Sequence, residues 1–157
     1  MPKAPLKEIR DAAEQHTVDV SRKQLSKALY HSPFREMPAT LLDTRYRAVS
    51  EDIWTQIFEY LQGDATKYGS EHYDNDDFGH ALAAFARTNL NVNGVGLIVD
   101  TQNSRSTVAI LLHDPQRAES KSIKIALVER DDHRRYGIAD PFTSEHYRPV
   151  EGFVLFD

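Results

Sequence analysis

The 157-residue chain contains no cysteine, and this absence removes a whole set of functions. A thiolate serves as the nucleophile of cysteine enzymes and as a ligand of zinc, and a disulfide needs two thiols. The chain itself therefore supplies no cysteine nucleophile, no thiolate metal ligand and no disulfide. The lack of cysteine is compatible with any cellular compartment.

Long apolar runs and an excess of positive charge are also missing. No segment approaches the roughly 20 apolar residues of a membrane-spanning helix, and residues 1–5 lack the apolar centre of a signal peptide. The 19 Lys and Arg residues are outnumbered by 24 Asp and Glu residues, for a formal charge of −5. Nonspecific nucleic-acid binding requires clustered positive charge. We therefore expect a cytoplasmic protein with neither a membrane nor a nucleic acid as its partner.

What the chain does contain is enough apolar surface to fold. Hydrophobic residues make up 40% of the sequence and aromatic residues 10%, which is typical of a globular domain with its own core. The sequence shows no internal repeat and no low-complexity tract. The composition therefore predicts one folded unit.

Helical patterns dominate the first half of the chain and strand patterns the second half. Helices are expected over residues 6–16, 22–30, 51–61 and about 76–89, with Ser21 and Ser50 as N-caps. Strands are expected over residues 44–49, 95–100, 107–113, 122–128 and 152–156. This order predicts an α+β fold, in which helices pack on a mostly antiparallel sheet. Within it, residues 1–44 are expected to form a helical extension and residues 45–157 the α+β domain.

The most informative stretch is Glu71–Ala86, which opens polar and acidic and then becomes a helix. Asp74 or Asn75 can accept a hydrogen bond from a free backbone N–H, and Asp76 and Asp77 suit the first turn, where the helix dipole favours negative charge. One apolar helical face follows and consists of Phe78, Ala81, Leu82 and Phe85. The pattern predicts a central, buried helix. The loop before such a helix is a common place for reactive groups.

The run Tyr73-Asp74-Asn75-Asp76-Asp77-Phe78 carries a resemblance to a known family. Together with the strand Val95–Asp100 and the polar hairpin after it, this run resembles the small papain-like cysteine-protease and transglutaminase-like domains found in phage and bacterial proteins and at the C-terminus of some fungal lectins. Their motif is Asp-Cys-Asp-Asp-Phe, a His follows on the next hairpin, and a Glu-containing motif comes later. The resemblance implies a papain-like fold.

Carried over by position, the resemblance implies that the catalytic machinery has been lost. The nucleophile position falls on Asn75, the histidine position on Ser106 or Thr107, and the third position on Glu129. An amide nitrogen is not a nucleophile at neutral pH, and neither hydroxyl can act as a general base. These three are therefore vestigial positions, and the resemblance implies a pseudoenzyme that keeps the fold without catalysis and without a cofactor.

Such a pseudoenzyme is expected to act by binding another protein. The candidate contact residues lie in the former cleft and in the charged loop beyond Glu129. They are His72, Asp74, Asn75, Asp76, Glu129, Arg130, Arg134 and Arg135. The expected partner is a host or cognate protein, and the expected role is that of a phage-type inhibitor or modulator of a host complex, an anti-defence protein.

Two alternatives remain open. Asp76 and His80 stand four residues apart on one helical face and His72 precedes them, so the three could hold zinc or manganese. In that case the protein would be a metal- or His/Asp-dependent hydrolase. The other alternative is a structural or assembly subunit without a ligand site.

Overall fold

The structure is a computed structural model that describes residues 5–62, 75–117, 122–131, 135–143 and 151–156. Within these residues the helices are α1 (Leu6–His16), α2 (Arg22–Tyr30), α3 (Glu51–Leu61) and α5 (Asn75–Leu90). The strands are β1 (Val18–Ser21), β2 (Ala39–Leu41), β3 (Arg45–Ala48), β4 (Val95–Asp100), β5 (Arg105–His113), β6 (Ile123–Arg130), β7 (Tyr136–Ala139) and β8 (Gly152–Phe156). None of the described helices is long and apolar enough to cross a bilayer.

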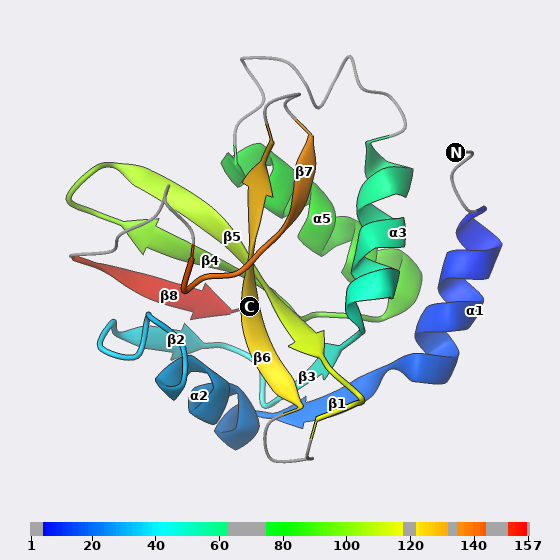
Figure 1. The fold of residues 1–157 in the computed structure, drawn as a ribbon, viewed down its shortest axis with the longest axis horizontal. Coiled ribbons are helices and arrows are strands. Elements are labelled where there is room, and N and C mark those ends of the chain that lie inside the picture. Colours follow the sequence, from blue (N-terminus) through cyan, green and yellow to red (C-terminus); the bar gives the residue numbers. More distant parts are fainter. Residues whose placement is uncertain (1–4, 63–74, 118–121, 132–134, 144–150, 157) are drawn as a thin grey trace.

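One six-stranded sheet organises the molecule, with the strand order β2-β8-β4-β5-β6-β7 (Figure 1). The pair β2 and β8 is parallel, and the other neighbouring pairs in this sheet are antiparallel. The strands β1 and β3 form a separate antiparallel pair. The expected α+β class and the mostly antiparallel sheet are therefore confirmed.

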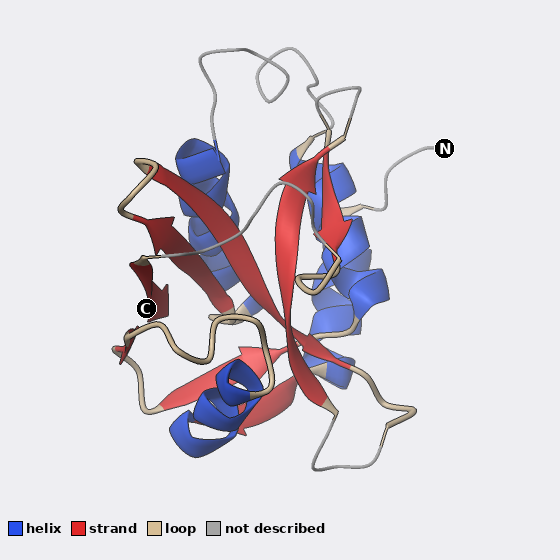
Figure 2. Ribbon diagram, turned by 60° about the vertical axis from the view of Figure 1, so that its left-hand side comes forward, coloured by secondary structure: helices blue, strands red, loops and turns tan. Residues whose placement is uncertain are grey.

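The neighbouring strands β5 and β6 have buried residues on both faces, because helices lie on either side of the twisted sheet (Figure 2). On one face, alternate residues of these strands pack against α1, α3 and α5; the strand residues are Val108, Ile110, Leu112, Ala126 and Val128. On the other face, the residues in between pack against α2, β1 and β3; these are Ala109, Leu111, Ile125 and Leu127. The alternation of Ile123, Ile125 and Leu127 with Lys124 and Ala126 predicts a half-exposed strand over 122–128. The structure buries residues 125–128 of β6 instead, so this expectation is wrong.

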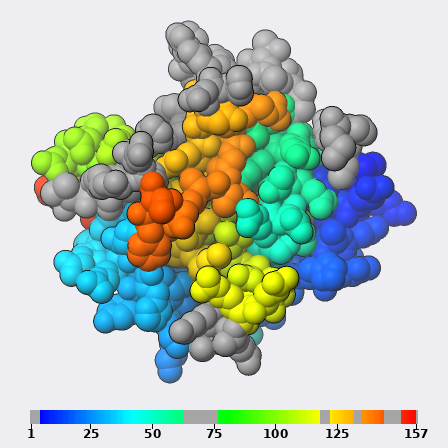
Figure 3. All heavy atoms as spheres, in the orientation of Figure 1, coloured from blue at the N-terminus to red at the C-terminus, as the bar shows by residue number. Residues whose placement is uncertain are grey.

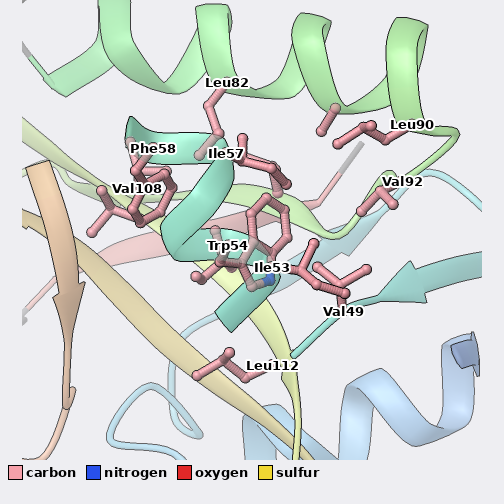
Figure 4. Packing of buried hydrophobic residues seen from close by; sticks show 14 of the residues in the cluster. Val49, Ile53, Trp54, Ile57, Phe58, Leu82, Leu90, Val92, Val108 and Leu112 are labelled. Carbon is pink, nitrogen blue, oxygen red and sulfur yellow. The ribbon is translucent and has the colours of Figure 1, made fainter. Parts of the chain in front are cut away.

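Aromatic side chains fill the first of these two clusters (Figure 4). Trp54 is fully buried on α3, and its indole N–H donates to the Leu111 carbonyl over 2.9 Å. The Trp54 and Phe58 ring centroids lie 6.2 Å apart, and Phe58 lies 5.9 Å from Phe78 on α5. Contacts of this kind between rings add to the apolar burial that fixes α3 and α5 on the sheet.

Helix α5 approaches the sheet closely at Gly79. A Cβ atom at this position would stand 2.8 Å from Val108 Cγ2 and 3.3 Å from Leu97 Cδ2, which is closer than ordinary van der Waals contact. Glycine lets the N-terminal part of α5 lie directly on β4 and β5. The start of α5, which the sequence singled out, is therefore held against the middle of the sheet.

Most expected elements are present, and three short strands were missed. Helix α1 spans the predicted residues, and α2 begins with the predicted Ser21 cap, where the Ser21 hydroxyl accepts from the Gln24 N–H and the Gln24 side chain accepts from the Ser21 N–H. Ser50 occupies the N-cap position of α3, but its side chain makes no capping hydrogen bond. The strands without a clear sequence signal are β1, β2 and β7.

Candidate binding groove

The predicted cleft at the start of α5 is only partly covered by the structure. His72, Asp74 and Arg134 lie outside the described residues. Asn75 and Asp76 form the first two positions of α5, and only their backbone is described. Their assignment as binding residues stays a prediction.

The two positions that the resemblance assigned to the histidine and to the third catalytic residue lie on neighbouring strands. Ser106 and Thr107 belong to β5 and Glu129 to β6, and these strands pair with Val108 opposite Val128. Continuing this register by one step places Thr107 opposite Glu129. Thr107 is buried, whereas Ser106 and Glu129 are half-buried.

The charged loop residues have mixed surroundings. The Arg130 guanidinium carbon lies 4.9 Å from the centre of the Tyr136 ring, a cation–π arrangement. The other face of that ring stacks on Phe78, with the centroids 3.9 Å apart and the planes 1° from parallel. Arg135 is exposed, and its backbone N–H donates to the Asp131 carboxylate over 2.9 Å. Arg130 is thus part of the packing between α5 and β7.

The alternative metal site is not tested by the structure. His80 is exposed on α5, His72 lies outside the described residues, and only the backbone of Asp76 is described. Among the side chains that the structure describes, no group of three or more His, Asp or Glu residues is placed to hold a metal ion.

A polar pocket of about 540 Å³ lies where β1 and β3 meet the turn between α5 and β4. It is lined by Asp19, Asp43, Arg45, Arg47, Arg87, Asn91 and Asn93. Asn93 holds this region together, since its side chain accepts from the Arg47 N–H and donates to the Asp43 carboxylate and the Arg45 carbonyl. Arg47 forms an ion pair with Asp19 at 3.3 Å. Much of the pocket's polar capacity is therefore used inside the protein, and its lining residues include no aromatic ring.

A larger hollow of about 760 Å³ lies along the first half of β6, and we call it the edge groove. Its apolar lining consists of Ala28, Leu112, Ile123, Ile125, Ala126, Ile138, Ala139, Pro141 and Phe142. Its polar lining consists of Gln24, Lys27, His31, Ser32, Glu51, Arg117, Lys124 and Asp140. Figure 3 looks onto this face, where the end of β7 and the turn after it, in orange, lie beside β6. An apolar hollow of this size with a few polar groups is typical of a binding site.

The edge groove exists because β7 is shorter than β6. Strand β7 pairs with β6 only from Arg130 opposite Tyr136 to Leu127 opposite Ala139. Continuing the register would place Pro141 opposite Ile125, but the chain turns there. The Asp140 carboxylate accepts from the Phe142 N–H over 2.9 Å, and the Asp140 carbonyl accepts from the Thr143 N–H over 3.3 Å. This turn takes the chain out of the sheet, and among the described residues no strand pairs with residues 123–126 of β6 on that side.

At the first residue of β7, the outer edge of the sheet is hydrogen-bonded by a side chain instead of a strand. The Gln62 amide donates to the Tyr136 carbonyl over 3.0 Å, and the Gln62 side-chain oxygen accepts from the Tyr136 N–H over 2.6 Å. These two bonds reproduce the pairing that an adjacent strand would offer. Within the part of the chain that the structure describes, the sheet edge is therefore capped at Tyr136 and open at the edge groove.

The charge around the edge groove is more positive than that of the chain. Its lining contains three cationic residues, Lys27, Arg117 and Lys124, against two acidic ones, Glu51 and Asp140. Arg117 pairs with Asp114 at 3.5 Å. Lys27 and Lys124 are exposed, and neither forms an ion pair within the described part of the chain. Two lysines thus border the groove on a protein of net charge −5.

Sequence reasoning missed the edge groove. Its walls come from α2, α3, β6 and the turn after β7, which are far apart along the chain. One local signal was available, since Phe142 follows Pro141 in an otherwise polar stretch and is 65% exposed. An exposed aromatic ring beside an apolar hollow is a common feature of interaction surfaces.

Comparisons with known proteins bear on the fold. No protein-family model matches the chain, and no curated protein matches it in sequence. Among solved structures, one described as a PSL1a–E64 complex is similar with a TM-score of 0.56 and 17% identity, over 88% of this chain and 51% of that one. Another is Polyporus squamosus lectin bound to the human-type influenza-binding epitope Neu5Acα2-6Galβ1-4GlcNAc, with a TM-score of 0.56 and 18% identity, over 88% of this chain and 49% of that one. The chain thus spans about half the length of the solved chains it matches, and at this identity the likeness concerns the fold.

These findings correct the family assignment. The similar structures are those of a lectin and are not described as papain-like or transglutaminase-like proteins, so the papain-like assignment is contradicted. The interpretation of Asn75, Ser106 and Glu129 as vestigial catalytic positions, and hence as those of a pseudoenzyme, depended on that assignment and is withdrawn with it. The phage and anti-defence labels have no support either, because no phage protein is among these similar structures. The α+β class stands on the structure alone.

Proposed function

We propose that the chain is a non-catalytic binding protein that holds a segment of another protein in the edge groove. The observation that carries this proposal is the groove itself, an apolar hollow of about 760 Å³ beside a sheet edge that β7 does not cover. Its size falls within the range of about 300–1,000 Å³ that is usual for binding sites.

The composition of the groove favours a protein segment over a sugar. Nine of its lining residues are apolar, and they meet the surface at the exposed ring of Phe142. Burying such a surface against an apolar side chain is favourable by about 25 cal/mol per Å². The polar residues at the rim can fix the orientation of the partner. The similar lectin was solved with a bound ligand, which is consistent with a binding role but concerns that protein.

The proposal can be tested with a library of ten-residue peptides displayed on yeast and selected on the full chain. Selected peptides are then measured against Phe142→Ser, which removes an exposed ring from the groove wall. The matched control is Leu42→Ser, because Leu42 is also an exposed apolar residue, 59% accessible, and lies outside the groove.

We expect Phe142→Ser to weaken binding about tenfold or more, since burial of an aromatic side chain is worth about 1.5–3 kcal/mol. Leu42→Ser should leave binding unchanged. Peptide-induced NMR shifts should map to the groove residues Ala28, Ile123 and Phe142. A selection that returns only peptides indifferent to Phe142, with shifts elsewhere on the molecule, would refute the proposal.

A further inference from the structure

The backbone of β6 directs hydrogen-bonding groups into the edge groove. In the β5–β6 ladder the Asp114 N–H donates to the Ser122 carbonyl over 2.7 Å, so alternate pairs from there exchange hydrogen bonds. Lys124 and Ala126 therefore point their backbone groups toward β5. Ile123 and Ile125 point theirs the other way, toward the place where β7 has ended.

These outward groups have no partner within the described residues. Neither Ile123 nor Ile125 bonds on that side to any residue that the structure describes, and the position that would face Ile125 is Pro141, which has no N–H to donate. Ile125 is only 4% exposed. Buried backbone groups are almost always hydrogen-bonded, because leaving one without a partner costs about 1–3 kcal/mol. The open edge is thus suited to another backbone.

We infer that the occupant of the edge groove is an extended, acidic segment of a partner protein, which adds to the sheet as a strand in line with β7. This inference rests on the proposed function and specifies the partner's chemistry. An extended segment offers alternating N–H and C=O groups that match those of Ile123 and Ile125. Its side chains would alternate between the α2 side and the α3 side of the sheet, where apolar lining is present on both.

The acidic character follows from the two lysines. Lys27 projects from α2 and Lys124 from β6, and neither has an ion-pair partner in the described part of the chain. Carboxylates on the incoming segment would meet these charges at the rim of the groove. Since exposed charges interact weakly at high ionic strength, binding should weaken as salt is added.

The decisive measurement is the amide exchange rate of Ile125 in the full chain, with and without a groove-binding peptide from the display library. Strand addition should slow Ile125 exchange about tenfold or more, because its N–H becomes hydrogen-bonded. The neighbouring amide of Ala126, which faces β5, is the internal reference and should change less. Unchanged Ile125 exchange at saturating peptide would overturn the strand pairing.

A pair of substitutions isolates the backbone contribution. Ile123→Pro removes the outward N–H at the first residue of β6 and leaves the β5 ladder intact, whereas Ile123→Ala shortens the side chain and keeps the N–H. We expect Ile123→Pro to bind peptide about three- to tenfold more weakly than Ile123→Ala, the effect of one hydrogen bond. Equal affinities of the two variants would contradict the inference.

Charge is tested with Lys27→Glu and Lys124→Glu against Lys23→Glu, an exposed lysine of α2 outside the groove. The first two should weaken binding about two- to fivefold at low salt and the third should not. Selected peptides rich in Lys and Arg would refute the acidic assignment.

The outcomes separate the inference from the proposed function. Peptides that require Phe142 but neither slow Ile125 exchange nor distinguish the Ile123 variants would leave the proposed function standing and overturn strand addition. If no peptide requires Phe142, the proposed function fails and the inference fails with it. Light scattering that shows a dimer of the protein, lost in Ile123→Pro, would identify a second copy as the occupant and refute a separate partner.

Discussion

Replacing Gln62 with alanine is expected to be among the most costly single changes at the sheet edge. The Gln62 side chain is buried and bonds both the N–H and the carbonyl of Tyr136, and it also donates to the Phe58 carbonyl over 3.2 Å. In Gln62→Ala, both Tyr136 backbone groups lose the amide that bonds them, at about 1–3 kcal/mol for each buried group. The free energy of unfolding should therefore fall by about 2–6 kcal/mol, a large part of the 5–15 kcal/mol that is usual for a domain.

Urea denaturation measures this loss, with Gln102→Ala as the matched control. Gln102 is an exposed residue in the β4–β5 turn, and only its backbone N–H forms a hydrogen bond there, so its truncation should be neutral. The variant Gln62→Glu provides a second test. Its carboxylate can accept from the Tyr136 N–H but repels the Tyr136 carbonyl, so burial and this repulsion raise the pKa of the new carboxyl above its usual value near 4.3.

The sign of the pH dependence follows. Above the raised pKa the glutamate variant bears the full penalty, and as the pH falls below it the protonated acid regains a donor. The stability deficit of Gln62→Glu relative to the unchanged protein should therefore shrink between about pH 7 and pH 4. A loss of less than about 1 kcal/mol in Gln62→Ala, the cost of a single lost bond, would refute the view that Gln62 replaces a strand at this edge.

Three further changes test other parts of the structure. Gly79→Ala should lower the free energy of unfolding by about 1–3 kcal/mol in spite of the better helix propensity of alanine, because the new Cβ would lie 2.8 Å from Val108 Cγ2. In urea denaturation, the double variant Gly79→Ala/Val108→Ala should be destabilised by less than the sum of the two single variants. Additive effects would contradict the close contact. The Asp100 carboxylate is enclosed and its pKa is held below the usual 3.8, first by the Asn103 side chain, then by the Asn103 backbone N–H and by Arg105, against the opposing effect of burial. The stabilisation by the Asp100 carboxylate is fully present above pH 3.8 and is lost as the pH falls through the lower folded pKa. The difference in the free energy of unfolding between the unchanged protein and Asp100→Asn should therefore become smaller in acid. A difference that stays constant with pH would count against this role of Asp100. Metal analysis of the purified protein and of the double variant Asp76→Ala/His80→Ala tests the alternative metal-dependent hydrolase. If that alternative holds, the protein contains about one equivalent of zinc or manganese and the double variant loses it. We expect far less than one equivalent in both proteins.

The elements that could be predicted from sequence are those whose signals are local. Ser21 and Gln24 form a capping box within one turn, and the apolar spacing of α3 and α5 repeats over several turns. Strand β5 was recognised from its continuous apolar run, which is the pattern of a strand covered on both faces. In each of these cases the information lies within the element itself.

The elements that were missed depend on distant residues. Strand β7 is four residues long and lies in a polar stretch, and it is fixed by pairing with β6, by the Gln62 amide and by the stack of Tyr136 on Phe78. No window of sequence around Tyr136 contains these partners. The same reason explains the edge groove, since its existence depends on where β7 ends relative to β6, a matter of register between two strands.

Lys124 at the open edge of β6 has two possible roles: it can protect the edge against association, or it can attract a partner of opposite charge. Unpaired strand edges invite association with other chains, and a charged residue such as Lys124 on a short edge is a common protection. Protection alone, however, does not require the apolar hollow beside it, nor the exposed ring of Phe142, since both increase the tendency to associate. A second copy of this protein carries a net charge of −5, so Lys124 gives little electrostatic protection against it. The same lysine attracts an acidic segment. The combination of open backbone, apolar lining and bordering lysines is therefore better explained by selective acceptance of an acidic strand than by general exclusion of strands.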